Sequence, residues 1–289
     1  MNILSIQSWV AYGHVGNASA VFPLQRLGAE VWAINTVQFS NHTGYGAWTG
    51  QVFTGEAVRA LLDGIEARGV LPSCDAVLSG YMGDAEIGAA ILDAVSRVRA
   101  ANPRALYCCD PVLGDDGRGV FVRPGIPDFM RARAVPQADI LTPNQFELEH
   151  LTGLGARSLA DTMRAVAALQ RSMAPDGRRI VLVTSVITEA TPPDALDLLA
   201  AGPDGAFLLR TPRLPITVNG AGDAIAALFL FHVLREGNPR AALELAGSSI
   251  HGLLRRTAEA GAREILTVAA QDEFVSPLVR YVARPLDGG

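Results

Sequence analysis

The chain has 289 residues, 49% of them apolar, and a net charge of −5. This length suits one large α/β domain or two small ones, and the acidic balance leaves no basic surface for nucleic acid. All 24 basic residues are arginine, which excludes both a Walker-type phosphate lysine and a Schiff-base lysine.

No apolar run approaches the length of a membrane span, and residues 1–6 lead into a strand pattern without a charged leader. Cys74, Cys108 and Cys109 have neither the spacing of zinc ligands nor that of a disulfide framework. We therefore expect a cytoplasmic protein with reduced, buried cysteines and no contact with a membrane.

Short apolar runs alternate with helical patterns along most of the chain. The runs predict strands at 2–6, 31–37, 51–53, 75–79, 105–109, 140–141 and 179–183. The helical patterns predict helices at 16–26, 56–68, 84–101, 126–133, 158–171 and 239–257, a short helix carrying Glu147, and a buried helix from Gly220. Loops are predicted at 9–14 and 39–46, two or three short strands within 194–215, and a strand at the start of 265–282.

This alternation favours one doubly wound, mostly parallel sheet with helices on both faces. No repeat or linker divides the chain, so residues 1–289 are predicted to form a single domain with a small flap near 51–53. Ligands of such sheets bind beyond the carboxyl ends of the strands. The polar clusters at those ends are Ser8, 39–46, 80–81, 110–115, 142–147 and 184–185.

One segment, Thr217–Phe229, combines two glycines, an aspartate and an apolar helix in the order T-V-N-G-A-G-D-A-I-A-A-L-F. Gly220, Ala221, Gly222 and Asp223 then form a first helical turn, whose unpaired backbone N–H groups attract an anion. Asp223 could take the proton of a hydroxyl that attacks this anion. The alternative is that Asp223 only complements the helix dipole.

This turn resembles that of the ribokinase-like small-molecule kinases, in which the glycine turn is the anion hole and the aspartate is the base. Further stretches resemble pyridoxal kinases and follow in the same order. They are S-I-Q-S at 5–8, G-H-V-G-N at 13–17, F-P-L-Q-R-L-G at 22–28, V-Q-F-S-N-H-T-G-Y at 37–45, D-A-V-L-S-G-Y at 75–81, C-D-P-V-L-G-D at 109–115 and T-P-N-Q-F-E at 142–147. The resemblance covers about residues 1–270 and implies a ribokinase-like three-layer sandwich and a homodimer.

The resemblance implies a substrate site for pyridoxal. Ser8 and Thr43 would hydrogen-bond the ring and its substituents, Val15 and Tyr81 would pack against it, and Asp223 would face its hydroxyl. Each residue also has an ordinary interpretation. Hydroxyls such as those of Ser8 and Thr43 usually serve turns and loops, and a large aromatic such as Tyr81 is usually core.

A site for Mg–ATP is implied as well. The ATP-binding residues would be Asp110, Asn144, Glu147, Thr184, Ser185 and Gly222. The metal-binding residues would be Asp110, Asp115, Thr142, Glu147 and Thr184. Magnesium is held by a few carboxylates together with phosphate oxygens and water, so these residues suffice. Alternatively, Asp115 is a solvated loop acid and Glu147 a first-turn dipole partner, whereas Asp110, directly after an apolar strand, would be costly to bury unpaired.

A second cation, K⁺ or Na⁺, is implied by resemblance to mammalian-type pyridoxal kinases. Asp110, Thr142, Glu147 and Thr184 lie at or just beyond strand ends that neighbouring strands bring together. Many bacterial relatives resemble one another in having lysine at the position of Thr184. Threonine cannot supply that positive charge, so an external cation is expected. The alternative is that Thr184 only ends its strand and that Mg²⁺ alone serves the phosphates.

The predicted function is ATP-dependent phosphorylation of the 5′-hydroxymethyl group of pyridoxal, and of pyridoxine and pyridoxamine, in vitamin B6 salvage. One alternative is hydroxymethylpyrimidine kinase of thiamine synthesis, which usually has a glycine-rich loop where this chain has the aromatic and polar segment 9–17. Another is a non-catalytic B6-binding protein, which would need neither Asp223 nor the acidic residues. The adenine contacts stay unassigned.

Overall fold

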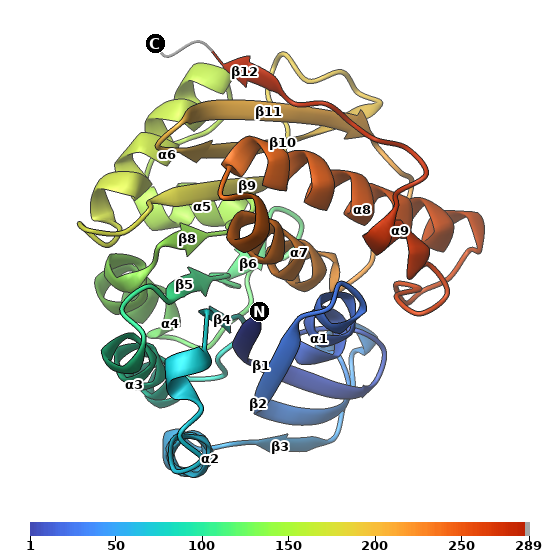
Figure 1. Ribbon diagram of the computed structural model, residues 1–289. Coiled ribbons are helices and arrows are strands. Elements are labelled where there is room, and N and C mark those ends of the chain that lie inside the picture. The colour runs from blue at the N-terminus through green and yellow to red at the C-terminus, as the bar shows by residue number, and fades with distance from the viewer. Residues whose placement is uncertain (287–289) are drawn as a thin grey trace.

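Ten strands form one sheet in the computed structural model, which describes residues 1–286 (Figure 1). Their order is β12-β11-β10-β9-β8-β5-β4-β1-β2-β3. The strands from β9 to β2 pair in parallel, whereas β3 and the strands β10 to β12 are antiparallel to their neighbours. The bounds are β1 Asn2–Tyr12, β2 Glu30–Asn41, β3 Gly50–Val52, β4 Ala76–Ser79, β5 Leu106–Cys109, β8 Ile140–Leu141, β9 Ile180–Val186, β10 Ala195–Gly202, β11 Gly205–Pro212 and β12 Arg284–Leu286. A separate hairpin pairs β6 (Gly114–Asp115) with β7 (Gly119–Val120).

Helices cover both faces of this sheet, which gives the predicted three layers (Figure 1). One face carries α1 (Asn17–Arg26), α7 (Ala221–Glu236), α8 (Pro239–Glu259) and α9 (Asp272–Val275), and the other carries α2 (Gly55–Glu66), α3 (Ala85–Ala101), α4 (Ile126–Phe129), α5 (Gln145–Thr152) and α6 (Leu159–Ser172). Short 3₁₀ turns lie at Thr43–Tyr45, Leu71–Ser73 and Val135–Gln137, and a π-helical turn at Met130–Ala134. Each face has its own apolar core, and β4 and β5, buried on both sides, are made almost entirely of apolar residues.

Capping residues explain where the helices begin. The Asp84 carboxylate accepts a hydrogen bond from the Ile87 N–H at 2.9 Å, so α3 starts as the sequence predicts. Ser158 and Asp161 form the predicted capping box of α6, since each side chain accepts a hydrogen bond from the other residue's N–H.

The first two strands are longer than predicted. Residues 9–12 continue β1 and residues 39–41 continue β2, so the two predicted loops are wrong over these parts. A register shift between Gln7 and Trp9 lets the extension pair with β2, Trp9 opposite Gln38 and Val10 opposite Phe39. With β3 these extensions form the predicted flap.

The strand predicted at the start of 265–282 is also wrong. This segment forms turns and the short helix α9, and the final strand, β12, follows it. Ile265, Ala270 and Phe274 are buried against the core that α7 and α8 share. Their burial explains the apolar run without a strand, because a helical turn hides its apolar side chains equally well.

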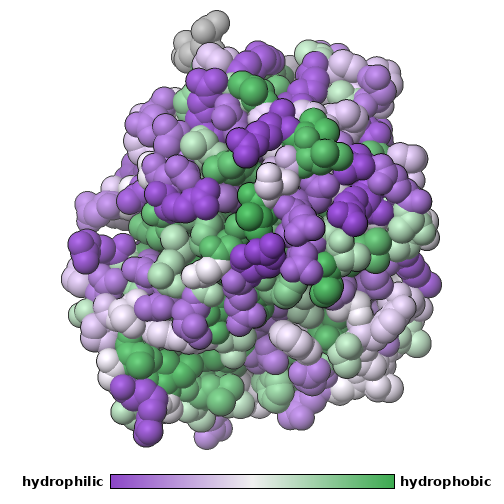
Figure 2. Space-filling model, turned by 45° about the vertical axis from the view of Figure 1, so that its right-hand side comes forward, coloured by the Kyte–Doolittle hydropathy of each residue, from purple (hydrophilic) through white to green (hydrophobic). Residues whose placement is uncertain are grey.

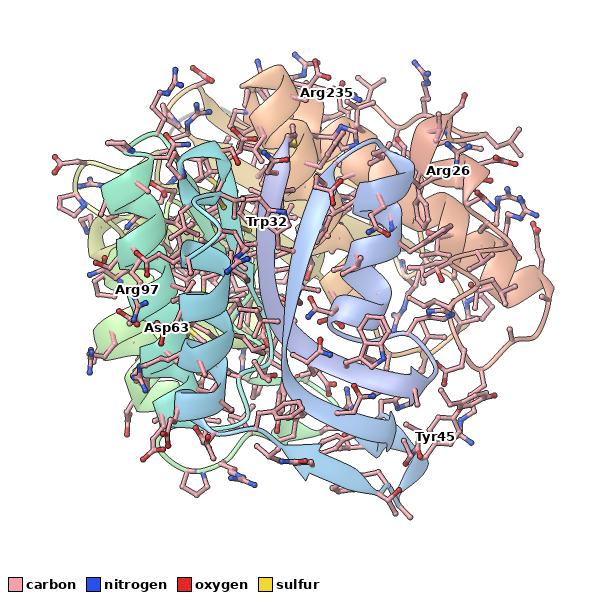
Figure 3. The ribbon with its side chains drawn as sticks, turned by 60° about the horizontal axis from the view of Figure 1, so that its bottom comes forward. Arg26, Trp32, Tyr45, Asp63, Arg97 and Arg235 are labelled. Carbon is pink, nitrogen blue, oxygen red and sulfur yellow. The ribbon has the colours of Figure 1, made fainter. Side chains whose placement is uncertain are left out.

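None of the helices within residues 1–286 combines the length and the apolar character that a membrane span requires. On the face shown in Figure 2, hydrophobic residues lie in patches interrupted by hydrophilic ones. On the outer helical layer, Arg97 of α3 contacts Asp63 of α2 at 2.6 Å (Figure 3). As an exposed ion pair it adds about 0–1 kcal/mol to the stability.

Candidate active site

A cavity of about 610 Å³ lies at the carboxyl edge of the parallel strands. It extends from the flap, past the ends of β4, β5, β8 and β9, to the hairpin of β10 and β11. Every residue predicted for the site lines it: Ser8, Val15, Thr43, Tyr81, Asp110, Asp115, Thr142, Asn144, Glu147, Thr184, Ser185, Gly220, Ala221, Gly222 and Asp223. The sheet topology therefore brings the predicted residues together, while their individual roles stay predictions.

The glycine turn packs against the loop that follows β1 and against the start of α1. Gly220 precedes α7 with φ +86°, a left-handed conformation that favours glycine. A Cβ at this position would lie 1.7 Å from the carbonyl oxygen of His14, and the Ser19 hydroxyl donates to the Gly220 carbonyl at 2.7 Å. Gly222 is exposed with open space where a Cβ would point. The first-turn N–H groups of α7 can thus receive an anion.

Asp223 is half-buried in the first turn of α7 and faces this cavity. Burial raises the pKa of its carboxyl to about 6, against the opposing effect of the backbone N–H groups of Gly16 and of Asp223 itself. A carboxylate with this pKa is charged at neutral pH and is a stronger proton acceptor than an ordinary aspartate. The geometry therefore suits a general base beside an anion.

Two further carboxylates are buried at the middle of the cavity. The Glu147 side chain accepts hydrogen bonds from the N–H groups of Leu113 and Asn144 at 2.7 and 2.9 Å, and the Asp110 carboxylate accepts one from the Thr142 hydroxyl at 3.0 Å. Burial, followed by the negative charges of Glu147 and Asp223, raises the pKa of Asp110 well above its ordinary value. Such a concentration of negative charge favours a bound cation.

The third acid, Asp115, lies in the β6–β7 hairpin, and its negative charge also acts on Glu147. Its Oδ2 accepts a hydrogen bond from Nε of Arg118 at 2.7 Å. Burial acts to raise the pKa of Asp115, but the hydrogen bonds and charge of Arg118 outweigh it and lower that pKa. Among residues 1–286, no three His, Cys, Asp or Glu side chains are grouped to hold a metal ion on their own.

One end of the cavity is formed by the flap and the loop after β1. Ser8 is buried, Val15 is half-buried, and the Thr43 side chain is exposed at the start of a 3₁₀ turn. The Glu264 carboxylate ties these loops together: it accepts hydrogen bonds from the Tyr45 hydroxyl at 2.6 Å and from the His14 N–H at 3.2 Å. Figure 3 shows Tyr45 beyond the end of β2.

The contacts of Glu264 also change the pKa of its own carboxyl group. Nε2 of His42 lies 2.9 Å from Oε1 of Glu264. Burial would raise the pKa of Glu264, but its hydrogen bonds with Tyr45 and His42 lower it below the ordinary value. The carboxylate is therefore charged at neutral pH and keeps its partners in place.

Comparison with known proteins decides the family. A family model described as phosphomethylpyrimidine kinase matches residues 46–268. The pyridoxal kinase PdxY of Granulibacter bethesdensis is 68% identical over 284 residues, which cover 98% of this chain and 99% of that protein. The chain belongs to the pyridoxal kinase family. A second member, the pyridoxal kinase PdxY of Deinococcus radiodurans, is 57% identical over 99% of this chain and 97% of its own.

Solved structures of pyridoxal kinases share the fold over the whole length. The enzyme from Leishmania donovani in complex with ADP and ginkgotoxin superposes with a TM-score of 0.91 at 29% identity, covering 99% of both chains. The same enzyme with ADP and pyridoxamine gives a TM-score of 0.90. The ribokinase-like α/β architecture predicted from the sequence is thereby confirmed.

Sequence reasoning missed the end of the cavity farthest from the flap. It is lined by apolar side chains of the β10–β11 hairpin, the segment that follows it and α8: Leu196, Leu198, Leu214, Ile216, Val218, Ile250 and Leu254. Leu214, Ile216 and Val218 alternate with exposed residues although no strand forms there. In the sequence of this pyridoxal kinase family member, that alternation could have indicated a segment that turns one apolar side toward the cavity.

Two residues at the cavity of this pyridoxal kinase have unusual backbone conformations. Val112 has φ +23° and Ser185 has φ +54°, and both line the cavity. Residues other than glycine rarely adopt positive φ, and a β-branched residue such as Val112 is a clear outlier. Such strain concentrates at functional sites, which agrees with a ligand-binding role for this edge.

Proposed function

We propose that this protein transfers the γ-phosphoryl group of ATP to the 5′-hydroxymethyl group of pyridoxal, and also of pyridoxine and pyridoxamine. One observation carries the proposal: Asp223 and the glycine turn face the middle of a cavity whose two ends differ in character. The flap end offers hydroxyls and an aromatic ring for a pyridine, and the far end offers an apolar wall for an adenine. The phosphates would lie between the two, at the N-terminus of α7.

In this function the side chains act by position and charge. Asp223 takes the proton of the attacking hydroxyl, and the N–H groups of Gly220 to Gly222 stabilise the charge of the phosphoryl group in transit. Ser8 and Thr43 hold the pyridine substituents, with Val15 and Tyr81 packed on the ring.

The donor set fits the predicted ions. Asp110, Thr142, Glu147 and Thr184 offer carboxylate and hydroxyl oxygens, the ligands that hard cations prefer, and Asn144 and Ser185 add polar atoms for phosphate. Burial, followed by repulsion from Glu147 and Asp223, raises the pKa of Asp110, and a bound cation would offset both effects. Mg²⁺ bound by these oxygens would neutralise negative charge on the phosphates of ATP, and K⁺ or Na⁺ would bind next to it.

The test is product identification by mass. The protein is incubated with Mg–ATP and, separately, pyridoxal, pyridoxine, pyridoxamine and hydroxymethylpyrimidine. A gain of one phosphoryl group on the B6 vitamers is expected. Phosphorylation of hydroxymethylpyrimidine alone would assign the activity that the family model's name describes. Binding of pyridoxal without any product would point to a carrier.

Replacing Thr43 by alanine tests the substrate end. We expect KM for pyridoxal to rise several-fold, since one neutral hydrogen bond contributes about 1 kcal/mol, with KM for ATP unchanged. Steady-state kinetics with each substrate varied in turn measure both constants. A change confined to KM for ATP would contradict the assignment of Thr43 to pyridoxal.

Titration of monovalent cations tests the second ion. Thr184 lies in β9, where its N–H donates to the Pro143 carbonyl at 2.9 Å, and it lines the cavity. In a tetramethylammonium buffer with fixed Mg–ATP and ionic strength, we expect saturable activation by K⁺ or Na⁺, and a weaker response in Thr184→Val. A flat response of the wild type to both ions would remove the site.

We further propose that residues 1–289 act as one domain, in the cytoplasm and as a homodimer. The single continuous sheet supports the first point, and the buried, free state of all three cysteines supports a reducing compartment. Analytical ultracentrifugation measures the oligomeric state.

A further inference from the structure

Two arginines line the described cavity, and they lie at different parts of it. Arg213 directly follows β11, at the apolar end. Arg118 belongs to the β6–β7 hairpin and lies opposite the glycine turn. Because the chain contains no lysine, Arg118 is the protein's candidate for a positive charge beside the phosphates.

The contacts of Arg118 link the hairpin to the glycine turn. Its Nη1 lies 3.4 Å from Oδ1 of Asn219, the residue before Gly220. Its Nε and backbone N–H both donate to the Asp115 carboxylate, at 2.7 and 2.8 Å, and the guanidinium lies over the Phe121 ring, 5.0 Å from its centroid. The side chain is 52% exposed, so it can change partners without disturbing a core.

The charges around Arg118 favour a change of partner from the Asp115 carboxylate to the phosphates of ATP. The cavity already holds the buried carboxylates of Asp110 and Glu147, and ATP adds several negative charges close to them. A guanidinium that holds a carboxylate presents the same fork of N–H donors to phosphate oxygens. The Asp115 carboxylate therefore occupies N–H donors of Arg118 that could bind phosphate oxygens instead. These donors lie within reach of the anion site at the glycine turn.

We propose that Arg118 is a catalytic residue that binds the phosphoryl group in transit, exchanging contact with Asp115 for contact with phosphate oxygens. This rests on the proposed kinase function. In the step, the hydroxymethyl oxygen bonds to the γ-phosphorus while the bond from that phosphorus to the bridging oxygen breaks. The hydroxyl proton passes to Asp223, and ADP leaves with the bridging oxygen and its electron pair. The exchange also frees the Asp115 carboxylate for Mg²⁺.

The first test compares two arginine variants. Arg118→Met removes the charge and keeps the length of the side chain. Arg131→Met is the matched control, because Arg131 also pairs with an aspartate three residues earlier, Asp128 at 2.8 Å, is similarly exposed and does not line the cavity. With K⁺ saturating, we expect kcat to fall about 10-fold to 10²-fold in Arg118→Met and to stay within about twofold in the control. Arg118→Lys should lie between, since lysine keeps the charge and loses the fork.

The second test uses binding alone. Calorimetric titration measures the affinity for Mg-ADP and for the non-hydrolysable Mg-AMP-PNP. Arg118→Met should weaken AMP-PNP about tenfold and ADP by less than about twofold, because only the former carries a γ-phosphate. Unchanged kcat in Arg118→Met, or equal weakening of both nucleotides, overturns the proposal. If the wild type phosphorylates no B6 vitamer, the proposed function fails, while a selective loss of AMP-PNP binding still supports Arg118 as the γ-phosphate ligand.

Discussion

Replacing Asp223 by asparagine is expected to lower kcat by about 10²–10⁴, the usual contribution of a positioned general base. The amide has nearly the same shape as the carboxylate, so the fold and the affinity for nucleotide should be kept. Steady-state kinetics, nucleotide titration and a melting curve measure the three properties. Activity within a few-fold of the wild type would contradict the role of Asp223 as a base and leave it as a partner of the helix dipole.

The pH dependence of the same site provides an independent check. Because burial raises the pKa of Asp223 to about 6, the carboxylate is charged above this pH and protonated below it. We expect kcat/KM of the wild type to fall as the pH drops through about 6, and this acidic limb to be weaker in Asp223→Asn, where the buried Glu147, whose pKa burial raises to about 7, still contributes to it. Asp272→Asn is the matched control, since Asp272 is also an acid in a helical first turn but does not line the cavity.

Replacing Gly220 by alanine is expected to destabilise the fold by about 3 kcal/mol and to lower kcat by about 10³-fold. A left-handed residue other than glycine costs about 1–2 kcal/mol, and here the new Cβ would also lie 1.7 Å from the His14 carbonyl oxygen. The backbone must shift to relieve this contact, which displaces the N–H groups of the anion turn. Urea denaturation and steady-state kinetics measure the two effects.

The variant Gly237→Ala separates the cost of the left-handed conformation from the cost of the contact with the His14 carbonyl oxygen. Gly237 follows the other end of α7 with φ +66°, but no atom lies within 4 Å of the position of its Cβ. We therefore expect this variant to lose about 1 kcal/mol of stability and to keep full activity. Equal losses of stability and activity in both variants would show that the close approach to His14 is unimportant.

Much of the fold could be predicted because local signals determine it. The buried strands β4 and β5 are short apolar runs, and capping residues such as Asp84 and Ser158 mark where α3 and α6 begin. The candidate site followed from the same logic. In a parallel sheet the carboxyl ends of the strands share one edge, so polar residues such as Asp110 could be assigned to a common site before any contact was known.

The remaining features depend on contacts between distant parts of the chain. Glu264 contacts Tyr45, which is 219 residues away in the sequence, and no local pattern indicates such a pair. The extension of β1 to Tyr12 depends on pairing with β2 after a register shift, which the polar residues at 7–8 conceal. The partner of Arg118 across the cavity, Asn219, is 101 residues away.

The contacts of Glu264 also bear on how the protein is made. A ribosome releases the flap and the loop after β1 long before residue 264 has been synthesised, and a nascent chain gains contacts in the order in which its segments emerge. Until Glu264 arrives, neither His14 nor Tyr45 has the carboxylate that joins their loops. We therefore expect the loops of His14 and Tyr45 to become ordered late in synthesis, after the central strands have formed.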